Sequence, residues 1–348
     1  MNPYVLTLFL LSLGLGTTLT FASSHWLLAW MGLEINTLAI IPLMAQHHHP
    51  RAVEATTKYF LIQATAAATI LFASTTNAWL LGEWNITHLT HPVAATMAIM
   101  ALALKVGLAP LHLWLPEVLQ GLDLTTGLIL STWQKLAPFA LIIQIAPSVS
   151  PTILITLGAL STFIGGWGGL NQTQLRKILA YSSIAHLGWM LIIIKFAPQL
   201  TMLTLATYII MTSAAFLTFK TTMTTKINTL ALTWTKNQTL MATTTLVLLS
   251  LGGLPPLTGF MPKWLILQEM TKQGLPLIAT LVALSALLSL YFYLRLCYTM
   301  ALTISPNTNN ASTPWRLLNT QSTLPLAMTT TMTLMLLPIT PAILTIFC

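Results

Sequence analysis

The 348-residue chain carries too few charges for a water-soluble protein. It has 14 basic and 6 acidic residues, so charged side chains make up 6% of the sequence, against roughly 25% in an ordinary globular domain. Hydrophobic residues reach 55%, and the mean hydropathy is +0.79. The net charge of +8 does not indicate nucleic-acid binding, because the basic residues stand singly between apolar runs. The composition predicts an all-α, polytopic membrane protein.

The sequence contains none of the common cofactor-binding motifs. Cys297 and Cys348 form no CxxC pair, and neither GxGxxG nor a Walker A motif occurs. We therefore expect no metal site in this chain, and no site for a nicotinamide, a flavin or an iron–sulfur cluster. The N-terminus shows neither a charged leader region nor an Arg-rich transit segment, so we expect no cleaved targeting sequence.

Eleven apolar runs are long enough to cross a bilayer as helices, which takes about 20 residues each. The runs are continuous, whereas the strands of a membrane barrel alternate apolar and polar residues. Turn residues such as Pro50, Gly121, Asp123, Asn171 and Pro198 mark the short breaks between them. We expect spans at 3–22, 25–45, 58–80, 93–115, 124–146, 151–170, 176–195, 200–220, 238–258, 275–302 and 323–347.

The basic residues in the loops and at the ends of these spans fall mainly on one side of the membrane. Only Lys195 and Lys272 lie on the side opposite to the N-terminus. This asymmetry is the one that the positive-inside rule expects, so we place the N-terminus on the matrix or cytoplasmic side and the C-terminus opposite. The N-terminal side receives Arg51, Lys58, Arg176, Lys177, Lys220, Lys226, Lys236 and Arg316, with Arg295 near it.

Four further ionisable residues are expected at membrane depth: Glu34, Lys105 and Lys135 inside predicted spans, and Lys263 just beyond the ninth. A charge at the bilayer centre costs on the order of 3 kcal/mol, so such residues usually face a wet or paired interior. They could form a structural ion pair, or a lysine could extend its ammonium group to the membrane surface. We favour a proton relay, because the proton affinity of a buried lysine depends on how close a carboxylate lies.

Two stretches of the chain resemble each other. Gly107 to Leu111 is followed by Pro116, and Gly253 to Leu257 is followed by Pro262, with the second proline six residues after Pro110 and Pro256 respectively. Because the stretches lie five spans apart, the second copy would be inverted in the membrane, which is typical of transporters. We predict two inverted five-helix repeats, at about 3–146 and 151–302, followed by an extra helix at about 323–347 within one transmembrane domain.

The prolines in these stretches predict broken helices. Proline donates no hydrogen bond to the carbonyl four residues back, so Pro110 frees Val106 O, Pro256 frees Gly252 O and Pro262 frees Thr258 O. Together with Pro255, these prolines are our candidate helix-break residues. Freed carbonyls at membrane depth need water or a side chain, so we expect a hydrated pocket beside a lysine at each break. A kink satisfied by a nearby Ser or Thr is the alternative.

Histidines supply two further relay candidates. His112 follows Lys105 by two helical turns, on the same face if the helix continues, and His186 lies inside the seventh span. For each, a satisfied core histidine is the more common role. The run from His47 to His49 lies in a loop without a partner cluster, so we interpret it as a solvated turn instead of a metal site.

The sequence resembles the antiporter-like membrane-arm subunits of mitochondrial NADH:ubiquinone oxidoreductase, respiratory complex I, over its whole length. The run from Asn171 to Ser183 is the most specific part of the resemblance. The stretches that carry it are 24–34, 58–61, 104–117, 132–138, 167–183 and 251–260.

This resemblance implies site residues and a function. In the family a glutamate and a lysine form a central pair, which Glu34 and Lys105 match; Lys135 matches a mid-membrane lysine, and Lys263 matches an ionisable residue on the second broken helix. The implied enzyme couples electron transfer from NADH to ubiquinone to outward proton movement. From the resemblance and the count of eleven spans, we expect the chain to lack the first three of the fourteen spans that bacterial members usually have.

The resemblance also implies where the chain works and with which molecules. NADH, FMN, the iron–sulfur clusters and ubiquinone are expected in other subunits of the complex. The expected partners are membrane lipids and the other membrane-arm subunits, neighbouring antiporter-like subunits among them, in the mitochondrial inner membrane, and no nucleic acid. Two alternatives remain open: a stand-alone proton/cation antiporter subunit, and a scaffold of the membrane arm that does not pump.

Overall fold

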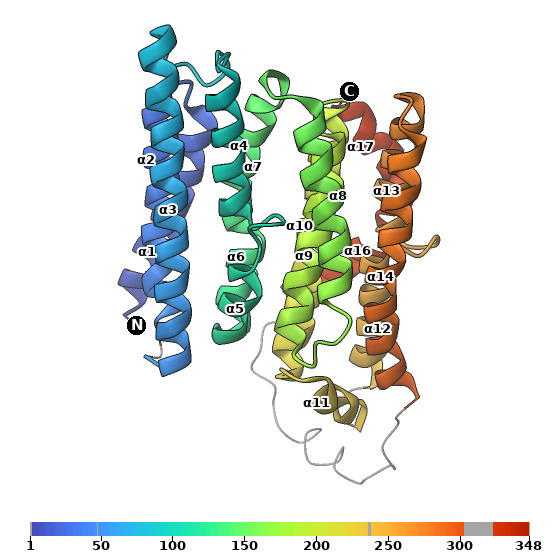
Figure 1. Ribbon diagram of the computed structural model, residues 1–348. Helices are drawn as coiled ribbons and strands as arrows, with labels where there is room; N and C mark the ends of the chain where they lie inside the picture. The colour runs from blue at the N-terminus through green and yellow to red at the C-terminus, as the bar shows by residue number, and fades with distance from the viewer. Residues whose placement is uncertain (1, 47, 236–237, 303–322, 348) are drawn as a thin grey trace. The chain divides into compact units, whose positions relative to one another are not determined.

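The computed structural model describes residues 2–46, 48–235, 238–302 and 323–347, and its regular structure there consists of helices (Figure 1). The only strand-like pairings among these residues are two isolated bridges. The chain divides into two compact units, Met1–Gly158 and Ala159–Cys348. His47, Lys236, Arg316 and Cys348 lie outside the described residues. The chain is a multi-pass helical membrane protein, as the sequence predicts.

Unit 1 is a ring of helices. Helices α1, α2, α3, α4 and α7 form this ring, because each contacts the next and α7 returns to contact α1. Helix α5 packs on α3, and α6 packs on α7. The unit contains α1 (Pro3–Ala22), α2 (Trp26–Met44), α3 (Pro50–Leu81), α4 (Pro92–Val106), α5 (Trp114–Gly121), α6 (Leu124–Ser131), α7 (Trp133–Ile145) and a 3₁₀ turn (Ala146–Ser148). Helix α8 (Pro151–Gly168) begins in unit 1 and continues into unit 2.

Unit 2 is built around α9, α10 and α13. Helix α13 contacts α9, α10 and α14, while α12 packs against α10, α14 and α16. Besides the end of α8, the unit contains α9 (Leu175–Ile193), α10 (Pro198–Thr222), α11 (Ile227–Ala231), a 3₁₀ turn (Leu232–Thr235), α12 (Gln238–Gly252), α13 (Phe260–Lys272), α14 (Pro276–Ala301), α16 (Leu324–Met335), a 3₁₀ turn (Leu337–Ile339) and α17 (Thr340–Phe347).

Several predicted spans agree closely with the helices. Seven described helices are long and apolar enough to cross a membrane: α1, α2, α3, the α6–α7 segment, α8, α10 and α14. Shorter apolar helices cover Pro92–Val106, Gln238–Gly252 and Leu324–Met335. Many helices begin at a proline, as at Pro50, Pro151 and Pro198, because the missing N–H of proline costs nothing in the first turn.

Two features of the chain differ from the predicted spans. The final span at 323–347 is not one helix, because Pro338 and Pro341 interrupt it and leave α16, a 3₁₀ turn and α17. Helix α13 was not expected as a separate helix. It carries Lys263, Gln268 and Lys272, and these polar residues end the apolar run that the sequence shows up to residue 258.

Two glycines let α1 and α2 approach closely. A Cβ atom on Gly32 would lie 2.6 Å from Thr20 Cγ2 and 2.9 Å from the carbonyl oxygen of Gly16. A Cβ atom on Gly16 would collide with the side-chain oxygen of Asn36. Small residues permit such backbone contacts between membrane helices, where packing replaces the hydrophobic effect as the main attraction. The contact holds Asn36 between α1 and the interior of unit 1.

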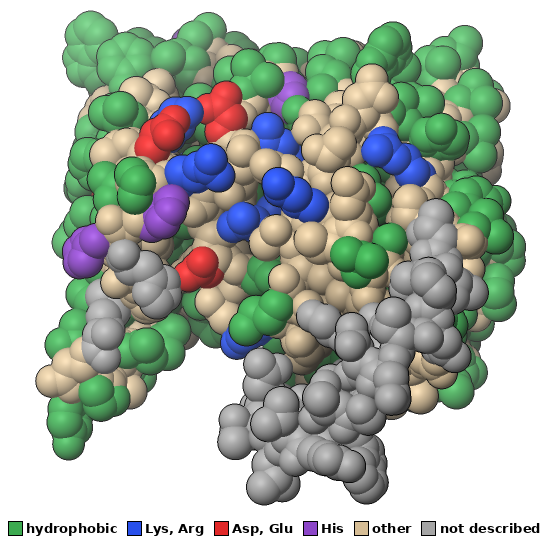
Figure 2. Space-filling view, turned by 90° about the horizontal axis from the view of Figure 1, so that it is seen from below, with side chains coloured by type: hydrophobic (Ala, Val, Ile, Leu, Met, Phe, Trp, Pro, Cys, Tyr) green, Lys and Arg blue, Asp and Glu red, His purple; other side chains and the backbone are tan. Residues whose placement is uncertain are grey.

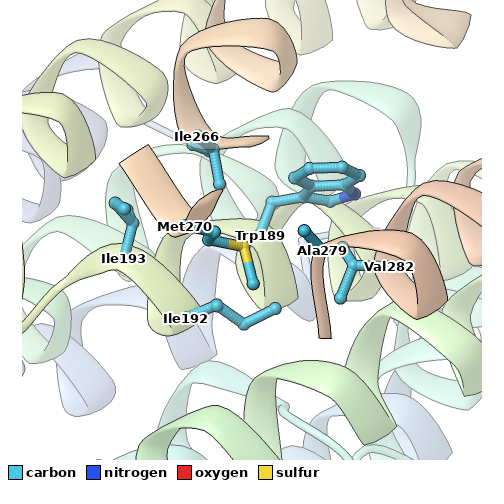
Figure 3. Packing of buried hydrophobic residues seen from close by; sticks show 7 residues of the cluster. All are labelled: Trp189, Ile192, Ile193, Ile266, Met270, Ala279 and Val282. Atoms are coloured by element: carbon cyan, nitrogen blue, oxygen red, sulfur yellow. The ribbon is translucent and has the colours of Figure 1, made fainter. Parts of the chain in front are cut away.

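A buried cluster fixes α13 in unit 2. Figure 3 shows its side chains interdigitating between three helices. The cluster consists of Trp189, Ile192 and Ile193 from α9, Ile266 and Met270 from α13, and Ala279 and Val282 from α14. Because Lys263 lies one turn before Ile266, this packing fixes the position of the lysine.

Charged side chains gather at one end of the helices. Figure 2 shows this face, which the lower ends of the helices in Figure 1 form, with lysine and arginine side chains spread over it. In unit 1, Lys58 of α3 lies 2.8 Å from Glu54 and 2.9 Å from Glu117 of α5. These ion pairs are exposed and contribute little stability, but the pair with Glu117 joins α5 to α3.

Candidate functional site

Unit 1 contains a small cavity among its helices. Its volume is about 20 Å³, enough for a water molecule, which needs about 10–15 Å³. Two of the predicted relay lysines, Lys105 and Lys135, both line it. The remaining lining residues are Leu33, Asn36, Thr37, Tyr59, Gln63, Val106, Trp114, Leu115, Leu130, Gln134 and Pro138. The sequence prediction of a pocket beside a lysine at the first break therefore agrees with the structure.

Lys105 lies in the last turn of α4 and is 6% exposed. Its ammonium nitrogen makes no hydrogen bond to any described residue. It interacts electrostatically with the carboxylate of Glu34, which is half-buried on α2 and accepts a hydrogen bond of 3.0 Å from Thr37 Oγ1. A buried ammonium group without partners costs several kcal/mol, so Lys105 is placed where water or a proton acceptor would stabilise it.

The break in α4 exposes two carbonyl oxygens to side chains. Gly107 adopts a left-handed conformation (φ 85°), and the next backbone N–H, of Leu108, donates back to Ala103 O. The carbonyls of Leu104 and Lys105 instead accept hydrogen bonds from Trp114 Nε1 (3.0 Å) and Gln63 Nε2 (3.3 Å). The Trp114 indole and the Gln63 amide thus supply hydrogen bonds to these two carbonyl oxygens. Our alternative had assigned that role to a nearby Ser or Thr.

Lys135 lies on α7 and is 3% exposed. The preceding residue, Gln134, donates a hydrogen bond of 3.2 Å to the backbone oxygen of Asn36 and so ties α7 to α2 beside the cavity. The structure therefore brings Lys105 and Lys135 to one cavity from two helices of the ring. The central pair and the mid-membrane lysine of the sequence analysis all lie in unit 1.

Unit 2 encloses a second cavity of about 20 Å³. His186 and Lys263, two more of the predicted residues, line it together. His186 also packs against Tyr208, with ring centroids 5.7 Å apart. The other lining residues are Trp189, Met190, Thr204, Thr207, Met211, Gly259, Pro262 and Ile266. Water, a lysine and a histidine can all exchange protons, so this cavity has the composition of a relay.

Lys263 closes the second helix break. Its ammonium nitrogen donates a hydrogen bond of 2.8 Å to the carbonyl oxygen of Gly252, the acceptor that Pro256 was predicted to free. Gly253 adopts the left-handed conformation (φ 82°), as Gly107 does in unit 1. A Cβ atom on Gly253 would lie 3.0 Å from the Lys263 Nζ atom. The second break is therefore built around the lysine itself.

The helix-break prolines do not all act as expected. Pro110, Pro255 and Pro256 lie in the non-helical segments between the half-helices. Pro262 lies in the first turn of α13, and Thr258 precedes that helix, so Pro262 removes no helical hydrogen bond from Thr258 O. Pro262 instead favours the start of the second half-helix, because first-turn N–H groups have no partner in a helix.

The predicted histidines occupy different environments. His112 is buried in the segment between α4 and α5 and donates a hydrogen bond of 3.2 Å to Pro110 O. It does not share a helix face with Lys105, because α4 ends at Val106. His49 caps α3 by accepting a hydrogen bond from the backbone N–H of Arg51, which fits the solvated turn that we expected there.

Sequence analysis missed the uncharged polar residues of the first cavity. Asn36, Gln63 and Gln134 are placed by three different predicted spans, and each lines the cavity. Their presence inside apolar runs was the available signal, since an amide at membrane depth needs a partner. Asn36 is 2% exposed, and its side chain makes no hydrogen bond to any described residue. Leaving such a group unsatisfied costs about 1–3 kcal/mol.

The fold agrees with comparisons to known proteins. A family model described as NADH:quinone oxidoreductase/Mrp antiporter, TM, matches residues 23–289. A second, described as NADH dehydrogenase subunit 2 C-terminus, matches residues 290–344. Both cavities lie on helices of the first match, which extends over most of the chain.

Curated relatives and solved structures are similar over nearly the whole chain. Relatives from Carassius auratus and Oncorhynchus mykiss, both named NADH-ubiquinone oxidoreductase chain 2, are 76% and 74% identical over 346 and 343 residues, 99% of this chain and 99% and 98% of theirs. A structure of respiratory complex I from Thermus thermophilus with bound Aureothin matches with a TM-score of 0.82 and 28% identity, covering 97% of this chain and 80% of the matched chain.

A more distant structure, of the Mrp complex from Dietzia sp. DQ12-45-1b, shares the fold. It matches with a TM-score of 0.83 at 16% identity and covers 97% of this chain and 76% of that one. The broken helices, the family models and the close relatives point to the same conclusion. The chain belongs to the NADH:quinone oxidoreductase/Mrp antiporter family and, within it, to the NADH-ubiquinone oxidoreductase chain 2 proteins.

Proposed function

We propose that the chain is a proton-translocating membrane-arm subunit of a respiratory NADH:ubiquinone oxidoreductase. The relatives at 70–76% identity carry the name of a subunit of that enzyme. The observation that supports proton translocation is the placement of a lysine beside a water-sized cavity at each of two helix breaks, Lys105 buried and Lys263 partly buried. A purely structural helix bundle would have no need for buried ammonium groups, because each is costly at membrane depth.

Each cavity has residues suited to proton transfer. In unit 1, Glu34 influences the charge state of Lys105, and Lys135 lines the same cavity as a second proton carrier. In unit 2, Lys263 and His186 are the corresponding pair. We assign these five residues to the relay, and His112 to a secondary position in the first break.

Electron transfer belongs to other subunits in this proposal. NADH, FMN, the iron–sulfur clusters and ubiquinone are bound elsewhere in the complex, and the redox reaction changes the charge states of the buried lysines through long-range electrostatics. In a low-dielectric interior a unit charge several ångströms away is enough to move a proton equilibrium by a factor of about ten or more. The subunit would lie in the mitochondrial inner membrane with its N-terminus on the matrix side, among other membrane-arm subunits and lipids.

The test is a lysine substitution in the assembled enzyme. Lys105→Met keeps the length of the side chain and removes its proton site, so we expect NADH oxidation and proton translocation to fall together. Lys272→Met is the matched control, because Lys272 lies at the exposed end of α13. Coupled translocation at the wild-type rate in the Lys105→Met enzyme would overturn the proposal. Cation exchange by the isolated chain in liposomes would instead favour a free-standing antiporter.

A further inference from the structure

Two unsatisfied polar side chains meet at the first cavity. Lys105 Nζ and both polar atoms of the Asn36 side chain make no hydrogen bond to any described residue, and both residues line the cavity. They come from different helices, α4 and α2, and both are more than nine-tenths buried. No direct hydrogen bond joins Lys105 Nζ to the Asn36 side chain, so neither group satisfies the other.

The volume of the cavity fits a single bridging molecule. About 20 Å³ accommodates a water molecule, and a buried water needs two to four polar partners. A charged lysine supplies donors and no acceptor, whereas the asparagine amide offers both an acceptor and a donor. A water between them can therefore accept from Lys105 Nζ and donate to Asn36, or reverse both bonds after Lys105 loses its proton.

The surroundings of Asn36 hold its amide in place. Its backbone oxygen accepts from Gln134 Nε2, next to Lys135. Its side-chain oxygen lies against Gly16 on α1, where any Cβ atom would collide with it. Asn36 thus lies between α1 and the cavity.

We propose that Asn36 holds a water molecule against the amino group of Lys105 and so acts as a positioning residue for proton transfer in unit 1. Its role in transfer rests on the proposed function, whereas the water site itself does not. An apolar residue at position 36 would fill the same space without burying a polar group that has no hydrogen bond. The free-energy cost of the buried amide is therefore explained if the amide binds a polar ligand.

The water site is tested directly in the wild-type enzyme. A cryo-EM map of the assembled complex that resolves waters should show one within about 2.7–3.2 Å of both Lys105 Nζ and the Asn36 amide. The same map of an Asn36→Leu complex should lack it. If waters are resolved elsewhere in the interior and none lies between these two groups, the proposal is overturned.

The positioning role is tested by coupled proton translocation in proteoliposomes. We expect Asn36→Leu to slow translocation about tenfold, which corresponds to about 1.4 kcal/mol, and Asn36→Ser to restore most of the rate because a hydroxyl can bind the same water. Gly16→Ala, which displaces the amide and also meets the backbone oxygen of Gly32 at 2.9 Å, should slow translocation as well. Gly14→Ala on the same helix is the control, because nothing lies within 4 Å of its added Cβ atom.

The outcomes separate this inference from the proposed function. Wild-type translocation in Asn36→Leu together with loss in Lys105→Met overturns the positioning role and leaves the proposed function standing. Wild-type translocation in Lys105→Met overturns the proposed function, and the cryo-EM map alone then tests the water site. If Asn36→Leu does not assemble, Gly16→Ala and Asn36→Ser decide the positioning role in its place.

Discussion

The ammonium nitrogen of Lys263 lies 2.8 Å from the carbonyl oxygen of Gly252, across the break between α12 and α13. Pro256 cannot donate to that carbonyl, so the lysine of the second half-helix replaces the missing backbone donor. A change in the charge of Lys263 therefore acts directly on the geometry of the break. In unit 1 the carbonyls of Leu104 and Lys105, near the end of α4, instead accept hydrogen bonds from Trp114 and Gln63, and Lys105 Nζ lines the cavity without a hydrogen bond to any described residue.

The contact between Gly253 and Lys263 gives a first prediction. Gly253→Ala should cost about 1–2 kcal/mol for the left-handed backbone and should also displace the lysine, whose Cδ and Nζ atoms lie 3.0 Å from the new Cβ atom. We expect reduced proton translocation as well as a lower thermal inactivation temperature of the complex. Gly274→Ala shares the positive φ (72°) in unit 2 but has nothing within 4 Å, so it should lower thermal stability alone. Equal translocation rates in the two variants would refute this prediction.

The indole of Trp114 is predicted to stabilise the first break. Trp114→Phe retains most of the ring and removes the donor to Leu104 O, and we expect a loss of about 1–3 kcal/mol in stability from the unsatisfied carbonyl. The thermal inactivation temperature of the assembled complex measures it. Trp79→Phe serves as the control because Trp79 is 88% exposed and should show almost no change. An unaltered temperature in Trp114→Phe would mean that this hydrogen bond does not stabilise the break.

Close packing of α1 on α2 predicts intolerance to added volume. Gly32→Ala places a methyl group 2.6 Å from Thr20 Cγ2 and 2.9 Å from a backbone oxygen, so the helices must separate, at a cost of about 1–3 kcal/mol. We expect less assembled complex, measured by native gel electrophoresis of the membranes. Gly14→Ala on α1 should assemble normally, since the added methyl group meets open space and alanine favours the helix. Normal assembly of Gly32→Ala would contradict the close contact.

The exposed ion pairs of Lys58 are predicted to matter little. Glu117→Gln removes one of two carboxylates around Lys58, and Glu54 on the same helix retains its contact at 2.8 Å. Solvent and salt screen charges at this exposure, so NADH oxidation and thermal stability should stay close to wild type. A strong loss of translocation in Glu117→Gln would show instead that this ion pair takes part in proton transfer.

The sequence predicts the spans well where apolar runs end at prolines. Helix α1 covers Pro3–Ala22, as expected, and α14 begins at Pro276, one residue from the expected boundary. Prediction fails where polar residues interrupt a helix, as Lys263 and Lys272 do in α13, because hydropathy then resembles that of a loop. It also fails at Pro338 and Pro341, which divide an apolar run that is otherwise long enough to span the membrane.

The sequence predicts only some of the residues of the candidate sites. Charges at membrane depth identify Lys105, Lys135 and Lys263, since each is too costly to leave in lipid. Burying an uncharged amide such as that of Asn36 costs less free energy than burying a charge, and many buried amides only pack between helices. The role of such a residue therefore depends on which way its side chain faces. The packing of Gly16 against it decides that direction, and no pattern in the sequence records a contact between two helices.

The central claim is that the lysines at the two helix breaks carry protons. The most direct measurement is the number of protons translocated per NADH oxidised, and the rate of that reaction, in proteoliposomes that contain the complex with Lys105→Met or Lys263→Met. The account predicts that each substitution lowers coupled translocation strongly, while Lys272→Met leaves it unchanged. Wild-type rate and stoichiometry in both variants would contradict it.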